Sequence, residues 1–214
     1  MALTNSTAGK PIRIMCVDDH PIFRQGLAAI IASDSELLLA CEVGSGGDAV
    51  GQYQQVKPDI TLMDLRLPDM HGIEAIAQIR NKNPTARIIV VTTEVGDATI
   101  QKALDAGAMG YIFKDMAMAE LLKIIHAVHA GQTSVPGLVA QTIAEHLGEQ
   151  ALSIRETEVV GLIAQGLRNK GVAEKLSISE ETVKMHVKNV MQKLNAKDRT
   201  HAVAIAIQRG FINV

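Results

Sequence analysis

Aromatic residues are scarce in this chain, and tryptophan is absent. Phenylalanine and tyrosine make up 2% of the 214 residues, whereas hydrophobic residues account for 47% and the mean hydropathy is +0.15. We therefore expect a core packed from Val, Ile, Leu, Met and Ala rather than from rings. The length is sufficient for one large or two small domains.

The sequence also lacks a disulfide framework and a metal-binding motif. Its two cysteines, Cys16 and Cys41, lie in or at the end of apolar segments and form no Cys-x-x-Cys pair, which indicates core thiols in a reducing compartment. The seven histidines show no metal-ligand spacing. His126 and His129 are interpreted as surface residues.

A membrane span and a signal peptide are not expected either. No segment approaches the roughly 18 consecutive apolar residues that a span requires. Residues 1–10 are small and polar, without the apolar stretch of a signal peptide. We therefore expect a cytoplasmic protein with no membrane partner.

Charge is distributed unevenly along the chain. Residues 151–214 contain 10 Lys/Arg and 6 Asp/Glu, which gives +4, whereas residues 1–150 contain 11 and 17, which gives −6. An acidic region followed by a basic one is typical of a regulatory domain joined to a nucleic-acid-binding module. Ordinary variation of surface charge is the alternative explanation.

Five apolar segments alternate with helical patterns in the first 130 residues. The predicted strands are residues 12–17, 37–43, 60–64, 87–92 and 109–113. This alternation predicts an α/β fold in which helices cover both faces of a parallel, doubly wound sheet. We expect the flavodoxin-like strand order 2-1-3-4-5, whose switch point falls between the first and third strands.

Three carboxylates converge at that switch point. Asp18 and Asp19 follow the first strand, and Asp64 ends the third. Each pair of carboxylates repels by about 1 kcal/mol in water and by about 4 kcal/mol at a protein-like dielectric. A hard divalent cation with oxygen ligands removes this repulsion, and Mg²⁺ suits a site that keeps several waters.

The same edge of the sheet carries groups suited to phosphoryl transfer. Asp64 is the candidate nucleophile, because carboxylates form aspartyl phosphates. Thr92 or Thr93 ends the fourth strand and Lys114 ends the fifth, where a hydroxyl and an ammonium group would hold phosphoryl oxygens. Each residue alone has an ordinary structural interpretation, but their occurrence at adjacent strand ends favours a site.

Residues 12–130 resemble the receiver domain of two-component signalling. The matching motifs are Val17-Asp-Asp-His-Pro21, Met63-Asp64 with Leu67-Pro68, Val91-Thr92, and Gly110-Tyr-Ile-Phe-Lys114. The resemblance implies that a sensor histidine kinase phosphorylates Asp64. It also implies that Asp18, Asp19 and the backbone carbonyl of Arg66 bind Mg²⁺.

The resemblance further assigns the residues around the phosphoryl group. It implies that Thr92, rather than Thr93, bonds to that group, that Lys114 pairs with it, and that Tyr111 swings inward behind Thr92. Two positions depart from the common pattern: Asp115 stands where many receivers have proline, and His71 where aspartate is common. We assign no function to His71.

The remainder of the chain predicts a second, all-α domain. Residues 10–131 form the predicted receiver, residues 132–150 a linker with a short helix, and residues 151–214 a domain with helices at 155–165, 169–176, 179–194 and 199–209. Ser153 and Glu156 form a Ser-x-x-Glu capping box at the first of these helices, and Ser179 is the predicted cap of the third. These helices complete the predicted fold.

The helix at residues 179–194 is amphipathic. Its core-facing stripe consists of Val183, Val187, Val190, Met191 and Leu194. The opposite face carries Lys, Asn and Gln side chains that can reach DNA base edges, with Thr and Lys beside them for phosphates. A solvated helix face is the alternative for this helix taken alone.

Residues 152–209 resemble the LuxR-type helix-turn-helix of NarL/FixJ-type response regulators. The matching motifs include Leu152-Ser-x-Arg-Glu156, Leu162-Ile-Ala-x-Gly-Leu167, Ile178-Ser-Glu-x-Thr-Val-Lys184 and Met185-His-Val-x-Asn189. The resemblance implies a recognition helix in the major groove of double-stranded DNA. The implied base contacts are Lys184, Met185 and Lys188, and the implied phosphate contacts are Thr182, Lys170 and Lys193. Gly171 stands where glutamate is usual.

The last helix predicts a homodimer in the active state. Val203, Ala206 and Ile207 share the face expected to lie on the core, whereas Ile205 points to the opposite side. Similar modules dimerise through this helix, so we expect a dimer contact near Ile205. A single exposed isoleucine is the alternative.

The sequence therefore predicts a phosphorylation-activated DNA-binding transcriptional regulator that is not an enzyme. An aspartate-nucleophile phosphatase would need a general acid two residues after Asp64, where Arg66 stands. A constitutive DNA-binding regulator, whose receiver only mediates protein contacts, is the other alternative.

Overall fold

A computed structural model describes residues 10–146 and 148–212 of the chain. No signal peptide is expected in residues 1–10, and residues 1–9 of this segment lie outside the described part of the chain. The chain divides into two compact units, one of Met1–Thr93 with Lys102–Val139 and one of Glu94–Gln101 with Ala140–Val214. The finer domain boundaries stay predictions. In the described part of the chain, no helix is long and apolar enough to cross a membrane.

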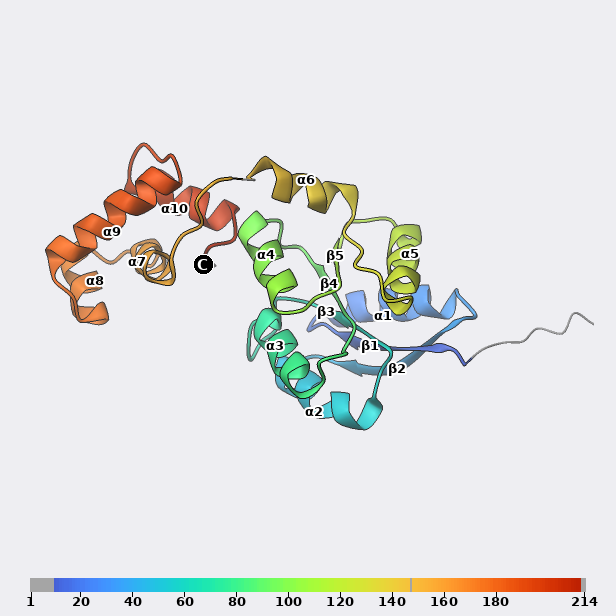
Figure 1. The fold of residues 1–214 in the computed structure, drawn as a ribbon. Helices are drawn as coiled ribbons and strands as arrows, with labels where there is room; N and C mark the ends of the chain where they lie inside the picture. Colours follow the sequence, from blue (N-terminus) through green and yellow to red (C-terminus); the bar gives the residue numbers. More distant parts are fainter. Residues whose placement is uncertain (1–9, 147, 213–214) are drawn as a thin grey trace, which may run out of the picture. The chain divides into compact units, whose positions relative to one another are not determined.

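The first unit contains a parallel sheet whose order is β2-β1-β3-β4-β5 (Figure 1). Its strands are β1 (Ile12–Val17), β2 (Leu37–Val43), β3 (Ile60–Met63), β4 (Ile88–Thr92) and β5 (Gly110–Phe113). Both β3 and β4 are buried along their whole length, as expected for strands covered on both faces. The predicted fold class and strand order are confirmed.

Helices follow the strands in the predicted alternation. Their bounds are α1 (Pro21–Ala32), α2 (Gly46–Val56), α3 (Gly72–Lys82), α4 (Asp97–Asp105), α5 (Met118–His129) and α6 (Gly137–Glu145). Within the first unit, α1 and α5 pack on one face of the sheet, and α2 and α3 lie side by side on the other (Figure 1). The short helix expected in the linker is α6.

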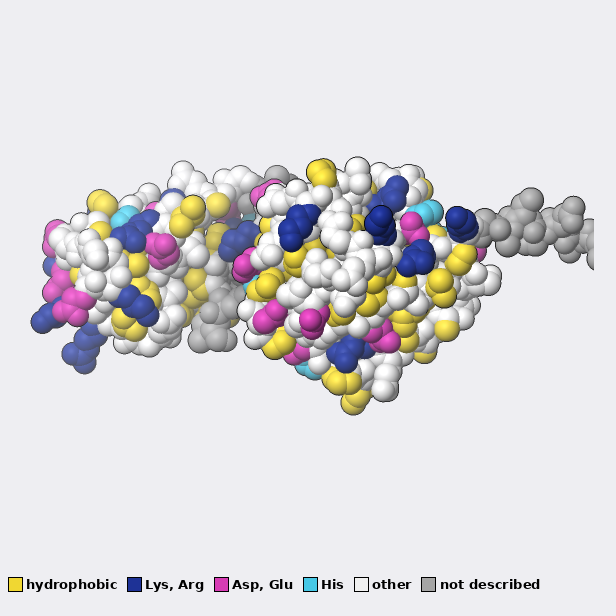
Figure 2. Space-filling model, turned by 90° about the horizontal axis from the view of Figure 1, so that it is seen from below, with side chains coloured by type: hydrophobic (Ala, Val, Ile, Leu, Met, Phe, Trp, Pro, Cys, Tyr) yellow, Lys and Arg dark blue, Asp and Glu magenta, His cyan; other side chains and the backbone are white. Residues whose placement is uncertain are grey.

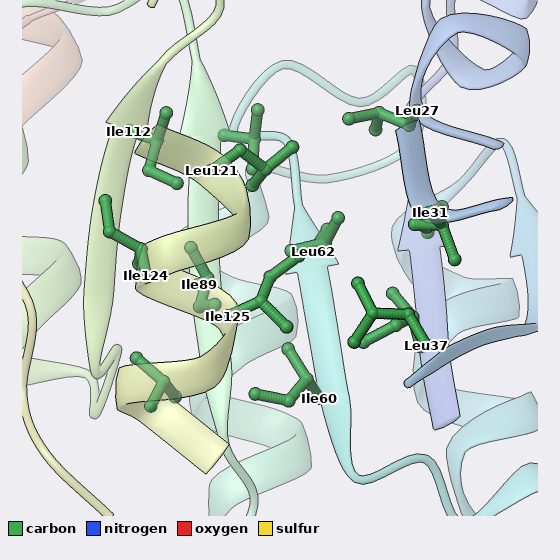
Figure 3. Packing of buried hydrophobic residues seen from close by; sticks show 14 of the residues in the cluster. Leu27, Ile31, Leu37, Ile60, Leu62, Ile89, Ile112, Leu121, Ile124 and Ile125 are labelled. Atoms are coloured by element: carbon green, nitrogen blue, oxygen red, sulfur yellow. The ribbon is translucent and has the colours of Figure 1, made fainter. Parts of the chain in front are cut away.

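An aliphatic core fixes the sheet between its helices. Figure 3 shows Ile60 and Leu62 of β3 among side chains from α1, α5 and the neighbouring strands. The labelled members of this cluster are Leu27, Ile31, Leu37, Ile60, Leu62, Ile89, Ile112, Leu121, Ile124 and Ile125. Burial of each such side chain stabilises the fold by roughly 1.5–3 kcal/mol. As the composition predicts, this cluster contains no aromatic residue among its fully buried members.

Four helices follow α6 in the second unit, as predicted. They are α7 (Ile154–Ala164), α8 (Asn169–Leu176), α9 (Glu180–Lys193) and α10 (Arg199–Gln208). The capping box of Ser153 and Glu156 is confirmed, with reciprocal bonds between each side chain and the other residue's backbone N–H. Ser179 caps α9, as expected, by accepting a bond from the backbone N–H of Thr182. Asp198 caps α10.

The prediction for α10 is correct for Ala206 and Val203, which lie on the core, but wrong for the two isoleucines. Ile205 is half-buried and packs against the core of the second unit, whereas Ile207 is 43% exposed. The buried positions of α10 are Ala202 and Ala206. The outward isoleucine of α10 is therefore Ile207.

Replacement of Gly171 by alanine is expected to stabilise the second unit by about 1 kcal/mol, because glycine inside a helix costs about that much. The nearest side-chain atoms to a methyl group at this position of α8 belong to Leu167, at 3.6 Å or more. Hydrogen exchange of α8 and α9 amides in the full chain measures the effect. Gly166→Ala is the matched control: its φ of +87° is unfavourable for alanine, so exchange should accelerate. Slower exchange in both variants would contradict this account.

Candidate functional site

The carboxyl ends of β1 and β3 bring three acidic residues together. Asp18 and Asp19 follow β1, Asp64 follows β3, and the backbone N–H of Asp64 donates to the carbonyl of Val17 at 2.8 Å. Carboxylate oxygens of the three residues lie within 4.8 Å of one another. Asp18 and Asp64 are 1% and 2% exposed, so water screens their repulsion poorly. The topology thus converges these carboxylates as the sequence predicts.

Lys114, at the end of β5, neutralises part of this charge. Its ammonium group donates to Asp64 Oδ2 at 2.7 Å and lies 2.5 Å from Asp18 Oδ2. Burial lowers the pKa of Lys114, but the bonds and charges of both carboxylates outweigh this effect, so the net pKa lies above its usual value. The lysine is therefore charged and fixed in front of Asp64.

The loop after β3 orients the Asp64 carboxylate. Asp64 Oδ1 accepts from the backbone N–H of Leu65 at 2.7 Å, which leaves Oδ2 directed at Lys114. This loop packs closely against the start of α3, since a Cβ at Gly72 would lie 2.1 Å from the Asp64 carbonyl oxygen. Only glycine fits there. Arg66 is exposed in the same turn, and the metal-binding role of its carbonyl stays a prediction.

Thr92 and Tyr111 lie on neighbouring strands behind this edge. Thr92 ends β4 and is fully buried, whereas Thr93 is exposed. Tyr111 is also fully buried, and its ring packs edge-on against Phe113 with ring centres 5.7 Å apart. The structure therefore has Tyr111 inside the protein. The switching roles of both residues stay predictions.

The first turn of α1 and the residue before it contribute three residues that the sequence patterns did not place in the site. The ring of Phe23 lies 4.5 Å from the Lys114 ammonium group, a cation–π contact. The guanidinium of Arg24 donates to the Asp18 carbonyl at 2.5 Å, and the ring of His20 faces the acidic pair. A signal was present: Pro21 begins the helix, so residues 23 and 24 project from its first turn beside the pocket.

The donor set fits a hard divalent cation. Asp18 Oδ2 is buried and pairs with the ammonium group of Lys114 at 2.5 Å. Three carboxylates at one open edge match the few-ligand, water-retaining coordination that Mg²⁺ adopts in proteins. Asp18, Asp19 and Asp64 are the side chains that would hold such an ion.

Asp69 and His71 connect this loop to the helices beside it. Both carboxylate oxygens of Asp69 accept from backbone N–H groups at the start of α2, from Gly46 at 2.8 Å and Gly47 at 2.7 Å. These bonds lower the pKa of Asp69. The ring of His71 accepts from the backbone N–H of Ile73 and so caps α3. His71 therefore has a structural role that the sequence did not reveal.

The outward face of α9 carries the predicted base-contacting residues. Lys184, Met185 and Lys188 are exposed, and Met185 retains 52% of its surface. With Ser179, Glu181 and Thr182 they line an open groove of about 580 Å³. Figure 2 shows lysine and arginine side chains on the helical unit at the left, with acidic side chains among them. The core-facing stripe is confirmed, since Val183, Val190 and Leu194 are buried.

The predicted phosphate-contacting residues differ in their surroundings. Lys170 is exposed at the start of α8, and the hydroxyl of the half-buried Thr182 bonds to Ser179 at the start of α9. Lys193 instead donates to Glu156 Oε2 at 2.7 Å and to the carbonyl of Ala151 at 3.2 Å. Its ammonium group already has partners inside the unit, so a DNA contact by Lys193 gains no support from this geometry.

Two family models match the chain, one over each region. Residues 14–126 match the response regulator receiver domain, and residues 150–206 match the bacterial regulatory proteins of the luxR family. An uncharacterized transcriptional regulatory protein, YxjL from Bacillus subtilis, is 38% identical over 94% of this chain and 97% of its own length. The nitrate/nitrite response regulator NarL from Escherichia coli K12 is 33% identical over 90% and 94%, respectively.

Two solved structures of response regulators are also similar, one over most of this chain and one over part of it. The response regulator ChrA of a heme-sensing two-component system is 32% identical, covering 95% of this chain and 100% of that one, with a TM-score of 0.58. A two-component response regulator of the LuxR family from Aurantimonas sp. SI85-9A1 is 40% identical over 64% of this chain and 99% of its own, with a TM-score of 0.62.

Replacement of Lys193 by methionine is expected to destabilise the second unit by about 1–3 kcal/mol, because the buried Glu156 carboxylate loses a charged partner. Burial raises the pKa of Glu156, but the bonds from Lys193 and Ser153 outweigh it, so the pKa lies below the ordinary 4.5. This group therefore stabilises the folded state above that pH, and the contribution is lost as the pH falls through the folded pKa. Denaturation across pH measures the effect.

The matched control is Lys184→Met. Lys184 pairs with Glu181 on the exposed surface at 3.0 Å, so its loss should change stability by less than about 0.5 kcal/mol. Equal stability losses in the two variants would refute a special role for the pair of Glu156 and Lys193. If Lys193→Met folds fully but binds DNA more weakly, the result would support the predicted phosphate contact of Lys193.

Proposed function

Since this chain belongs to the two-component response regulators that join a receiver domain to a LuxR-type DNA-binding domain, we propose that Asp64 is the residue through which its DNA binding is controlled. The chain is a DNA-binding transcriptional regulator of this class. The observation that carries the assignment of Asp64 is its position between Lys114 and the pair Asp18 and Asp19. A sensor histidine kinase is the proposed phosphoryl donor.

The pocket is suited to attack by Asp64 on a phosphoryl group. Asp64 Oδ1 is held by backbone N–H groups, and Lys114 can pass from Oδ2 to an incoming phosphoryl oxygen without leaving the pocket. Thr92, at the end of β4, is the proposed hydroxyl donor to the same group. Asp18 and Asp19 would hold Mg²⁺, which when bound offsets the charge of the transferred group.

The proposed output is DNA contact by α9. Lys184, Met185 and Lys188 are proposed to face base edges in the major groove, with Lys170 and Thr182 on phosphates. The active form is proposed to be a homodimer on half-sites about 10 bp apart. Ile207 is the exposed isoleucine of α10 and is a better candidate for the dimer contact than Ile205.

Neither of the two alternative functions, a phosphatase or a constitutive DNA-binding regulator, is favoured. A phosphatase with an aspartate nucleophile needs a proton donor two residues later, and Arg66 is a cation that does not serve as an acid at neutral pH. A constitutive regulator does not require the buried Asp64 to be bonded to the half-buried Lys114 in the receiver. The complete constellation supports a regulated protein.

Acetyl phosphate with Mg²⁺ is expected to label the protein on Asp64, and Asp64→Asn should abolish the labelling. Beryllofluoride with Mg²⁺ should tighten DNA binding of the wild type and leave Asp64→Asn unchanged. Intact-mass spectrometry and a DNA-binding titration are the measurements. Thr93→Ala is the control, since Thr93 is exposed beyond β4 and should behave as wild type. Labelling that persists in Asp64→Asn would overturn the assignment.

Lys188→Ala is expected to weaken binding to the preferred DNA site by about 1–3 kcal/mol and to relax base preference there. Lys170→Ala should weaken binding to all sequences equally and lower the salt slope by about 1. Selection from random DNA identifies the site, and titrations at several salt concentrations compare the variants. The control is Lys123→Ala, an exposed lysine on α5. An equal loss in all three variants would show a nonspecific charge effect.

A further inference from the structure

Glu181 is an acidic residue on the surface of α9 that is proposed to face DNA. It lines the open groove of this helix together with Lys184, Met185 and Lys188, the proposed base-contacting residues. The other residues of this lining are neutral or basic. A carboxylate repels DNA phosphates, so its presence in the groove lowers the affinity for every DNA sequence alike.

Folding stability accounts for little of this arrangement. Glu180 and Glu181 both lie in the first turn of α9, where a negative charge interacts favourably with the helix dipole. Glu181 also pairs with Lys184, whose ammonium group donates to Glu181 Oε2 at 3.0 Å. The two side chains are 83% and 58% exposed, respectively, and exposed ion pairs contribute little to stability. The pair therefore places an acceptor and a donor side by side in the groove.

A carboxylate beside an ammonium group is complementary to the major-groove edge of a G·C base pair. Guanine presents the acceptors O6 and N7 at this edge, and cytosine presents its N4 amino group as a donor. Lysine donates to the guanine acceptors, and glutamate accepts from the cytosine amino group. An ammonium group has three N–H donors and a carboxylate has two acceptor oxygens. Lys184 and Glu181 can therefore bond to a base pair while they stay bonded to each other.

We infer that Glu181 is a specificity-determining residue, which accepts from the N4 amino group of a cytosine while Lys184 donates to the guanine of the same base pair. An A·T pair fits these two side chains less well. Adenine presents the acceptor N7 beside its amino group, where it repels a carboxylate, and thymine presents O4 beside a methyl group. The inference rests on the proposed function, in which α9 lies in the major groove.

The test compares Glu181→Gln with Glu180→Gln in the full chain. Both substitutions remove one negative charge from the first turn of α9 at an exposed position, but Glu180 is not among the residues that line the groove. Circular dichroism verifies that both variants fold. Selection from random DNA with beryllofluoride and Mg²⁺ identifies the preferred site of each protein. Titrations with duplexes that carry each of the four bases at the selected cytosine then measure the discrimination.

The wild type and Glu180→Gln are expected to bind the cytosine duplex about tenfold or more tightly than the other three. Glu181→Gln should lose this preference or transfer it to adenine, because glutamine bonds to both N6 and N7 of adenine. Both variants should bind unrelated DNA more tightly than the wild type does, since each has lost a negative charge.

An unchanged preference for cytosine in Glu181→Gln, or an equal loss of preference in both variants, would overturn the inference. A wild type that selects no sequence at all would contradict the proposed base contacts of α9 as well. Because acetyl phosphate labelling of Asp64 is measured separately, a failure of the proposed phosphorylation is distinguishable from a failure at Glu181.

Discussion

Repulsion among Asp18, Asp19 and Asp64 is the constraint on which the receiver depends. Two like charges at about 4 Å repel by about 4 kcal/mol at a protein-like dielectric, and two of these carboxylates are almost fully buried. The carboxylates cannot separate, because the N–H of Asp64 bonds to Val17 and ties the end of β3 to that of β1. Positive charge nearby relieves this repulsion. Lys114 supplies one such charge, and a divalent cation is the natural second.

The aliphatic core makes this constraint effective. Ile60 and Leu62 of β3 are close-packed in the core, and Asp64 directly follows this strand, so the packing fixes the backbone that carries the carboxylate. Gly72 lets α3 approach the backbone of Asp64 closely, and Asp69 fastens the same loop to α2. Core packing of β3 and the hydrogen bonds between Asp69 and the backbone of α2 therefore both fix the loop that contains Asp64.

Local patterns predicted most of this architecture. The alternation of apolar strands with helical patterns predicted the sheet, and the Ser-x-x-Glu spacing at Ser153 predicted the start of α7. Both patterns depend on residues close in sequence. The two isoleucines of α10 were assigned to the wrong faces because Ala202 and Ala206 supply little contrast in hydropathy, so tertiary packing decides which isoleucine is covered. Lys193 resembled a surface lysine because its partner Glu156 lies 37 residues earlier.

The location of site residues followed from topology, but their orientations did not. The carboxyl ends of parallel strands lie at the same edge of a sheet. For this reason the sequence could predict that Asp18, Asp64 and Lys114 lie close together. The direction of the His20 ring depends on a side-chain rotamer that no periodicity encodes. The contact of Phe23 with Lys114 likewise required the position of α1 against β5.

The size of the proposed switch limits how it can work. Moving a two-state equilibrium from 1:99 to 99:1 requires about 5.5 kcal/mol of differential stabilisation. A hydrogen bond to a charged group contributes about 1.5–3 kcal/mol, so the interaction of Lys114 with a phosphoryl group is insufficient alone. Part of it is also offset, because Lys114 must give up its bond to Asp64. A phosphoryl group on Asp64 therefore needs a second donor such as Thr92, or the additional free energy of dimerisation, to change DNA binding decisively.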